Sequence, residues 1–102
     1  MILGQSDLPA TTNTEIFECG AGKKAWVAVN FCCRAGAANV RLAHTSGGTP
    51  GDADWIEYDV PLAVGGPPLL REGIRLEDGE KLYAWASAED VSVNVYGKEE
   101  DI

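Results

Sequence analysis

Strict alternation of apolar and polar side chains near the end of the chain is the feature that most constrains its fold. Within Val91–Gly97 a valine occupies every second position, and Ser92, Asn94 and Tyr96 lie between the valines. Successive side chains of a β-strand point to opposite faces, so a period of two predicts a strand whose valines lie in a core. We therefore expect a sheet with one buried face and one outward face.

Comparable segments recur along the chain, whereas helical signals are nearly absent. No window repeats apolar residues at the i, i+3, i+4, i+7 spacing of an amphipathic helix for more than a turn. Strands are predicted at Glu15–Cys19, Lys24–Cys33, Ala38–Thr45, Asp54–Val60, Lys81–Ser87 and Val91–Gly97, with weaker signals near Leu62 and at Leu69–Ile74. Short strands separated by turns are typical of antiparallel sandwiches and jelly rolls. The predicted fold is all-β: a small antiparallel β-sandwich, jelly-roll-like, in a single domain.

Glycine- and proline-rich clusters separate several of these strands, at Gly20–Gly22, Gly47–Gly51 and Gly65–Pro68. Glycine adopts left-handed backbone angles and proline lacks an amide donor, so each cluster should interrupt a ladder of hydrogen bonds. Both ends are expected to lie outside the sandwich. Residues 1–14 would form an N-terminal arm, residues 15–98 the β-sandwich domain and residues 99–102 an acidic C-terminal tail. Such an arm is either frayed or reaches over a neighbouring subunit.

The alternation also assigns side chains to faces. Core positions are predicted for Val27, Val29, Phe31, Val40, Leu42, Ile56, Tyr58, Val60, Leu82, Ala84 and Ala86. Trp26, Trp55, Tyr83 and Trp85 then fall on outer faces or at sheet ends, where aromatic side chains often belong to an interface. The alternative is that one or two of these rings fill the core, because sequence alone does not fix the register of a strand.

Composition and charge argue against two classes of partner. Sixteen acidic and eight basic side chains give a formal charge of −8, and too few clustered Lys and Arg are present to displace counterions from nucleic acid. No stretch approaches the ~20 apolar residues of a membrane helix. The N-terminal segment also lacks the basic flank and apolar run of a signal peptide. We expect no nucleic-acid or membrane partner, and synthesis in the cytosol.

Three cysteines, Cys19, Cys32 and Cys33, leave at least one thiol without an intrachain partner. Cys32 and Cys33 are adjacent on a predicted strand, so their side chains should point to opposite faces. A tight hairpin at Gly20–Gly22 would pair Cys19 with a residue near Lys24, which argues against a bridge between Cys19 and Cys32. Three outcomes stay open: three reduced thiols, an intermolecular disulfide formed in an oxidising medium, or an intrachain bridge after neighbouring strands rearrange.

Residues suited to catalysis or metal binding are few. His44 is the single histidine, it has no ligand-pair spacing with the cysteines, and its alternating strand favours a buried or rim position. Asp52 and Asp54 lie in a loop that lacks the further ligands and central glycine of an EF-hand, which favours a solvated acidic loop. No nucleophile elbow, phosphate-binding glycine loop or paired acid and base is recognisable. The protein is expected to be non-enzymatic, with no cofactor and no metal.

Three segments in a fixed order carry a resemblance to a known group of proteins. They are an apolar strand with a small-residue turn, AWVAVNFCCRAGAANVRLAH, a middle element, WIEYDVPLAVGG, and a closing hairpin with an acidic end, KLYAWASAEDVSVNVYGKEED. Over Ile16–Asp101 the chain resembles the small β-sandwich accessory virion proteins of tailed bacteriophages. Where that group tends to carry Asn before an arginine, this chain has Cys33 beside Arg34, which favours a covalent role for Cys33.

The resemblance implies a non-enzymatic structural protein that self-associates and decorates or reinforces the phage particle at its collar or neck, tail surface or capsid. It implies a virion location after assembly in the host cytoplasm, contacts with other virion proteins, and a homo-oligomer, for which we expect a trimer. The candidate interface residues are Trp26, Trp55, Tyr83 and Trp85, and the candidate disulfide residues are Cys19, Cys32 and Cys33. Two alternatives are a host-receptor or carbohydrate-binding sandwich of a phage tail, and a cytosolic prophage-derived protein without a virion role.

Overall fold

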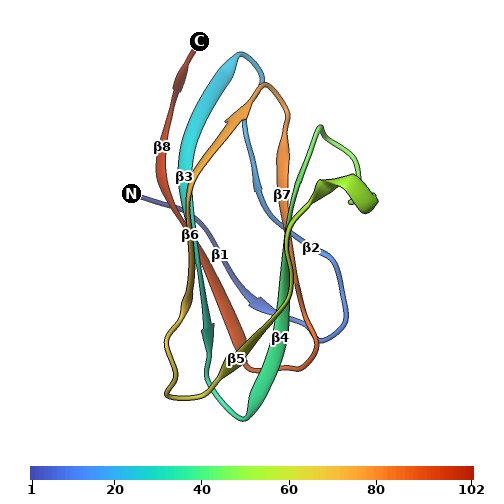
Figure 1. The fold of residues 1–102 in the computed structure, drawn as a ribbon. Coiled ribbons are helices and arrows are strands. Elements are labelled where there is room, and N and C mark those ends of the chain that lie inside the picture. The colour runs from blue at the N-terminus through green and yellow to red at the C-terminus, as the bar shows by residue number, and fades with distance from the viewer.

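Eight β-strands and one short 3-10 helix make up the protein in the computed structural model, which describes residues 1–102 (Figure 1). The elements are β1 (Ile2–Leu8), β2 (Thr14–Glu18), β3 (Lys23–Cys33), β4 (Ala37–Thr45), η1 (Asp52–Asp54), β5 (Trp55–Ala63), β6 (Leu69–Glu77), β7 (Lys81–Ala86) and β8 (Val91–Asp101). The three predicted glycine- and proline-rich turns separate strands as expected. The chain has no helix with the length and apolarity to cross a bilayer.

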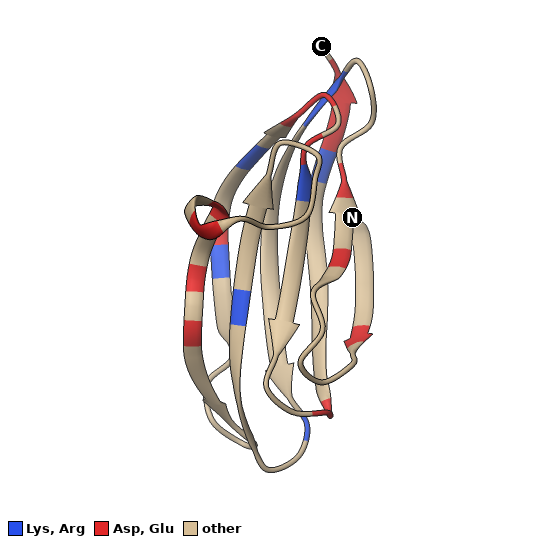
Figure 2. Ribbon diagram, turned by 90° about the vertical axis from the view of Figure 1, so that its right-hand side faces the viewer, with Lys and Arg blue, Asp and Glu red and all other residues tan.

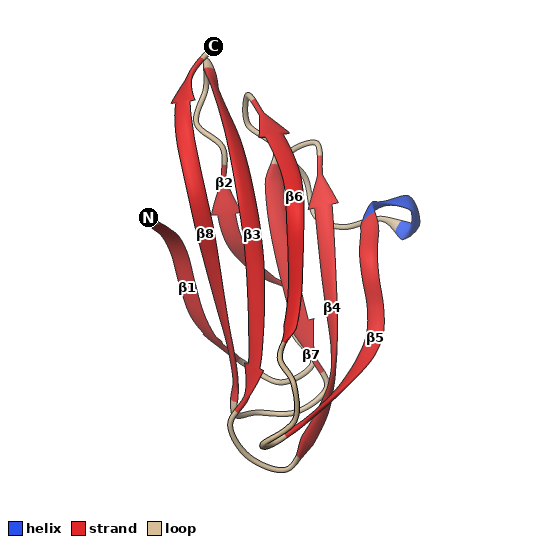
Figure 3. Cartoon of the chain, turned by 60° about the vertical axis from the view of Figure 1, so that its left-hand side comes forward, coloured by secondary structure: helices blue, strands red, loops and turns tan.

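The strands form two four-stranded sheets that face each other as the layers of a sandwich (Figure 1). The first sheet has the order β1-β8-β3-β6 and the second β2-β7-β4-β5, and Figure 3 looks onto the first. β1 pairs with β8, β2 with β7, β3 with β6 and β4 with β5, all antiparallel, as in a long hairpin rolled over on itself. This is the jelly-roll arrangement, so the predicted jelly-roll-like sandwich is confirmed.

The core lies between the two sheets and is built largely from the predicted alternating positions. Val27, Val29 and Phe31 of β3 are at most 4% exposed, and the three valines of β8 are buried with them. Together, 21 buried residues form one continuous apolar cluster. Removing apolar surface from water is the main force that favours folding, at about 25 cal/mol per Å². The outward side chains of the same strands are thereby placed on two opposite faces of the molecule.

Strand β5 departs from the predicted alternation. Tyr58 is 57% exposed, so its predicted place in the core is wrong. The register between β4 and β5 shifts at this point, because Tyr58 and Asp59 together lie opposite Arg41. Asp59 also has a left-handed φ of 54°. Such a β-bulge inserts one residue into a strand and re-aims the side chains on either side of it.

Both ends of the chain differ from the expected arm and tail. β1 is a strand of the first sheet that pairs with β8, and its Leu8 is only 2% exposed. Gly4 permits β1 to approach β2 closely, because a side-chain carbon at this position would overlap the carbonyl oxygen of Ile16. The acidic end is continuous with β8, which pairs with β3 as far as Asp101. The terminal segments are therefore held in the sheet, where their backbone groups find hydrogen-bond partners.

Candidate functional site

The four aromatic residues predicted to form an interface lie on two different faces. Trp26 projects from β3 on the outer face of the first sheet, while Trp55, Tyr83 and Trp85 belong to the second sheet. Trp26 is exposed and both Trp55 and Trp85 are half-buried. Tyr83 is only 8% exposed, so it offers little surface to a partner, contrary to expectation. The reason is its central strand, since β7 is flanked by β2 on one side and β4 on the other.

On the second sheet, the guanidinium of Arg41 lies between two aromatic rings. Its Cζ is 4.0 Å from the ring centroid of Tyr58 and 3.9 Å from that of Trp85. Its Nε donates a hydrogen bond to Asp59 Oδ1 at 2.6 Å, which raises the pKa of Arg41 above its ordinary value. A cation over an exposed ring contributes about 0.5–1 kcal/mol. The stack therefore fastens β5 to β4 and β7.

The same stack occupies the aromatic surface of the second sheet. The ring of Trp55 meets that of Tyr58 edge to face, with centroids 5.6 Å apart at 74°. Around these rings, charged side chains pair within the chain, as Lys81 does with Glu15 at 3.0 Å. Sequence reasoning missed the role of Arg41, because its position across from Trp85 depends on the pairing of β4 with β7. The aromatic and charged side chains of the second-sheet face are thus largely in contact with one another.

The outer face of the first sheet differs, because its apolar side chains are open to solvent. We call it the first-sheet face and define it by Ile2, Trp26, Ala28, Asn30, Leu70, Asn94 and Tyr96. Its four large apolar side chains, Ile2, Trp26, Leu70 and Tyr96, are each 40–53% exposed. Tyr96 lies directly across from Ala28 in the β3–β8 pair, and Asn30 lies across from both Asn94 and Leu70. The apolar side chains therefore come from all four strands of this sheet.

A shallow depression lies near the middle of this face. It has a volume of about 330 Å³, and its lining includes Trp26, Ala28 and Tyr96. Uncharged amides lie next along the strands, where Gln5 Nε2 donates to Asn94 Oδ1 at 3.0 Å. Charged positions are more frequent toward the end of the sandwich that carries the C-terminus (Figure 2). Glu72 also lines the depression, and Lys24 and Arg75 lie 5.2 and 5.4 Å from the ring centroid of Trp26. The first-sheet face thus combines aromatic and amide groups at its centre with charged side chains around Trp26.

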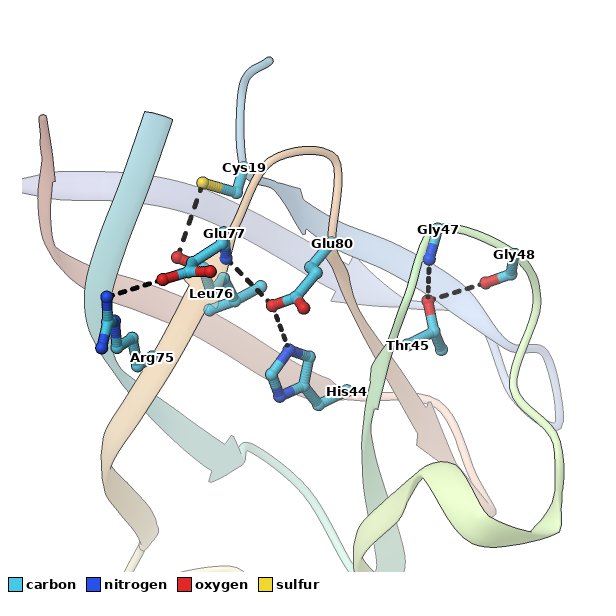
Figure 4. A network of polar contacts seen from close by, with 9 residues as sticks. All are labelled: Cys19, His44, Thr45, Gly47, Gly48, Arg75, Leu76, Glu77 and Glu80. Carbon is cyan, nitrogen blue, oxygen red and sulfur yellow. Dashed lines mark hydrogen bonds and ion pairs between the residues drawn. The ribbon is translucent and has the colours of Figure 1, made fainter. Parts of the chain in front are cut away.

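A polar network joins the second sheet to the β6–β7 turn at one end of the sandwich (Figure 4). Glu80 Oε1 lies 2.9 Å from His44 Nε2 and accepts a hydrogen bond from the Glu77 amide at 2.9 Å. Arg75 in turn pairs with Glu77 at 2.6 Å. Burial opposes the charge of Glu80, but the bonds from Glu77 and His44 outweigh it and lower its pKa. The His44 side chain is 29% exposed, which confirms the predicted rim position. Its contact with Glu80 connects β4 of the second sheet to the turn that follows β6 of the first.

The three cysteines are all free. Cys19 is buried beside the start of β3 and donates to the Leu76 carbonyl at 3.8 Å, and burial raises the pKa of its thiol. Cys33 is buried at the far end of β3, which is eleven residues or roughly 35 Å long. A Cys19–Cys32 bridge is therefore out of reach, as predicted. Cys32 and Cys33 point to opposite faces, also as predicted, and only the Cys32 thiol is exposed.

The acidic loop that the sequence raised as a possible metal site forms a short 3-10 helix. Asp52 and Asp54 lie in η1, where Asp54 Oδ2 accepts a hydrogen bond from the Gly51 amide at 2.8 Å. No group of three or more His, Cys, Asp or Glu side chains is placed to hold a metal ion. Comparison with protein-family models, with curated proteins and with solved structures finds no match to this chain.

Proposed function

We propose that this protein is a non-enzymatic structural subunit of a bacteriophage virion. It self-associates, contacts other virion proteins and decorates or reinforces the particle at its collar or neck, its tail surface or its capsid. The observation that carries the proposal is the first-sheet face, where Ile2, Trp26, Leu70 and Tyr96 expose apolar surface on a small acidic chain. Such surfaces on small soluble proteins commonly mark sites of association.

The chemistry and the fold support this proposal in different ways. Exposed aromatic rings with few charges at the centre and charged groups at the border are the usual composition of a protein interface. The jelly roll recurs in viral shell proteins, but also in lectins, so it supports a virion role only by analogy of fold. The sequence resemblance to phage accessory proteins, which rests on the order of three segments, supplies the virion setting.

The proposal includes a covalent link between subunits through Cys32. Cys19 and Cys33 are buried, and their thiols donate to backbone carbonyl oxygens, so neither is available to a neighbour without local unfolding. Cys32 is exposed at the end of β3, across from Ser92. Two Cys32 thiols of neighbouring subunits could form a disulfide only after release into an oxidising medium.

A carbohydrate-binding or host-receptor function is the second candidate, and one observation favours it. Trp26 and Tyr96 line the depression of about 330 Å³, and the amides of Asn30 and Asn94 lie nearby. Aromatic rings cover the apolar face of a sugar, while amides bond its hydroxyl groups. Trp85, a candidate interface residue from the sequence, is instead stacked on Arg41.

The proposed function is tested by the native mass of the purified, air-exposed protein and by its detection in purified particles. We expect a multiple of 10.8 kDa in solution, and the chain among the proteins of washed virions from the producing phage. On a non-reducing gel, the crosslinked band should disappear after Cys32→Ser but persist after Cys33→Ser. A protein that stays monomeric at high concentration and is missing from particles would contradict the proposal.

A further inference from the structure

We infer that the first-sheet face is a two-fold interface on which a second copy of this chain packs. The inference rests on the proposed self-association and adds to it the surface, the symmetry and the residues. It places Trp26, Leu70 and Tyr96 in the contact and leaves Trp55 and Trp85 outside it.

The distribution of exposed apolar side chains selects this face. Eight large apolar side chains are exposed in the whole chain, and four of them lie on the first-sheet face. Of the other four, Met1 and Ile102 are the terminal residues and Val64 lies in the β5–β6 loop. Tyr58 is covered on one side by Arg41 at 4.0 Å, whereas the cations beside Trp26, Lys24 and Arg75, are farther from its ring centroid, at 5.2 and 5.4 Å. The second sheet also brings aromatic rings together, at Trp55, Tyr58 and Trp85, but only Tyr58 is among the exposed ones.

The size of the face fits a stable contact. Four strands spaced about 4.8 Å apart span roughly 19 Å, and an eleven-residue strand adds roughly 35 Å in the other direction. The footprint is therefore about 650 Å², and the relief of the side chains increases the area that would be buried. A standard interface buries about 800 Å² on each partner. The face is thus large enough for a dimer when most of it is used.

The charges around the face favour a second copy despite the net charge of −8. At one end Lys24 and Lys98 each form an ion pair with Glu100, and at the other Arg34 pairs with Asp7. The rows of Ala28 and Asn30 carry aromatic and amide side chains, whereas the row of Trp26 places Lys98 and Arg75 on the two neighbouring strands. Repulsion between two acidic chains is therefore weaker here than on surfaces where carboxylates stand unpaired.

Two of the four edge strands, β5 and β6, are poor alternatives for self-association. β5 contains Pro61, which lacks an amide donor, and the bulge at Asp59. β6 carries Gly73 with a φ of 75° beside a register shift against β3. Proline and bulges interrupt the row of backbone groups that an added strand would need. Contact through a face therefore explains association better than pairing through β5 or β6.

The symmetry follows from the presence of one such patch. A single patch that contacts its own copy closes as a two-fold dimer, whereas a ring of three needs two different complementary patches on each subunit. Of the two sheet faces, only the first gathers several exposed large apolar side chains, since Tyr58 is the one exposed ring of the second-sheet cluster. We therefore expect a native mass of twice 10.8 kDa, where the sequence resemblance suggested a trimer.

A matched pair of substitutions tests the interface. Tyr96→Ser removes a ring from the first-sheet face, and Tyr58→Ser removes a similarly exposed ring from the second sheet. We expect Tyr96→Ser to weaken dimerisation about tenfold or more, as for a central interface residue, with Tyr58→Ser close to wild type. Sedimentation equilibrium gives the dissociation constants, and circular dichroism confirms folding. Leu70→Ser on edge strand β6 is the second variant if Tyr96→Ser fails to fold.

The outcomes separate this inference from the proposed function. An oligomer that is unaffected by Tyr96→Ser and Leu70→Ser, or one with three times the chain mass, overturns the two-fold face but leaves self-association standing. A wild-type protein that stays monomeric at high concentration overturns both. Loss of binding to a host glycan array in Tyr96→Ser, with the dimer intact, would assign the face to a sugar instead of a second copy.

Discussion

Arg41 illustrates how an outward charged side chain can hold a β-sandwich together. It alternates with core residues of β4, and its guanidinium is held in place by Tyr58, Trp85 and Asp59. Arginine suits this position because its group is planar and can stack on two rings while it donates hydrogen bonds in its own plane. Its contribution is to fix β5, an edge strand, against the centre of the second sheet.

We predict that Arg41→Lys destabilises the protein by about 1–2 kcal/mol, because lysine keeps the charge but loses the stacking and the Nε donor. Urea unfolding followed by circular dichroism measures the change. Arg71→Lys is the control, since Arg71 pairs with Glu57 on the surface at 3.2 Å, and exposed pairs contribute about 0–1 kcal/mol. Equal losses of unfolding free energy in the two variants would show that the stack on Arg41 contributes no more than an ordinary surface ion pair.

Glu80 should make the stability of the protein dependent on acidic pH. Its pKa is lowered in the fold, so the native state binds fewer protons at this site than the unfolded chain does. The contribution is therefore complete above the ordinary glutamate pKa, about 4.3, and is lost as the pH falls through the folded pKa. The Glu77 amide and His44 are the groups that hold the carboxylate charged.

We expect Glu80→Gln to lower the free energy of unfolding at neutral pH and to flatten its decrease on acidification. The measurement is a series of urea titrations between neutral pH and about pH 3, the range in which glutamate protonates. Glu72→Gln is the matched control, because no ion pair of Glu72 is present in the structure. An acid limb with the same slope in wild type and Glu80→Gln would disprove the linkage.

Among the elements, β1 is the one whose role depends most on tertiary context. Only Leu8 of its seven residues is buried, and its hydrogen-bond partner is β8, at the other end of the chain. A segment with so little apolar content is typical of a terminal arm. Its strand conformation is favoured because, without β1, the backbone groups along one edge of β8 would have no partner. Gln5, Ser6 and their neighbours pair with that edge.

We predict that Leu8→Ala costs about 2–5 kcal/mol, as for other large-to-small substitutions in a core. Ile2→Ser, at the exposed start of the same strand, should change the stability of the monomer by less than about 0.5 kcal/mol. Thermal or urea unfolding compares the two variants. Hydrogen exchange of the Gln5 and Ser6 amides gives an independent readout. Rapid exchange at both, with a neutral Leu8→Ala, would return residues 1–14 to a frayed arm.

For the molecule as a whole, net charge and surface chemistry act in opposite directions. The chain carries −8, which keeps copies apart at long range, while the first-sheet face attracts at contact. Salt shortens the range of the repulsion, from about 30 Å at 0.01 M to about 8 Å at 0.15 M. Apolar contact at the face is not weakened in this way.

Self-association should therefore strengthen as salt is added. We predict a dissociation constant that falls between about 0.01 M and about 0.15 M ionic strength, because screening removes repulsion between acidic subunits. Sedimentation equilibrium at several salt concentrations provides the test, with Tyr96→Ser as the variant that lacks the apolar attraction. A dissociation constant that rises with salt would mean that ion pairs, rather than the aromatic face, hold the subunits together.

The strands could be predicted from sequence wherever every second residue is apolar. In β3, β7 and β8 a period of two is imposed by the backbone itself, so Val29, Leu82 and Val93 were placed in the core correctly. The outward direction of Trp26 followed from the same rule. Tyr58 was misplaced because a bulge at Asp59 interrupts the period, and neither residue type signals a bulge.

The sequence by itself determined an all-β sandwich, the core faces of its regular strands and the separation of Cys19 from Cys32, because these depend on local periodicity and turn chemistry. The tertiary structure alone decided the strand partners, the inclusion of both termini and the contrast between the two outer faces. These depend on contacts between residues far apart in the chain, such as Gln5 with Asn94 and Arg41 with Tyr58. Local pattern does not encode such contacts, since backbone groups can pair with any strand that reaches them.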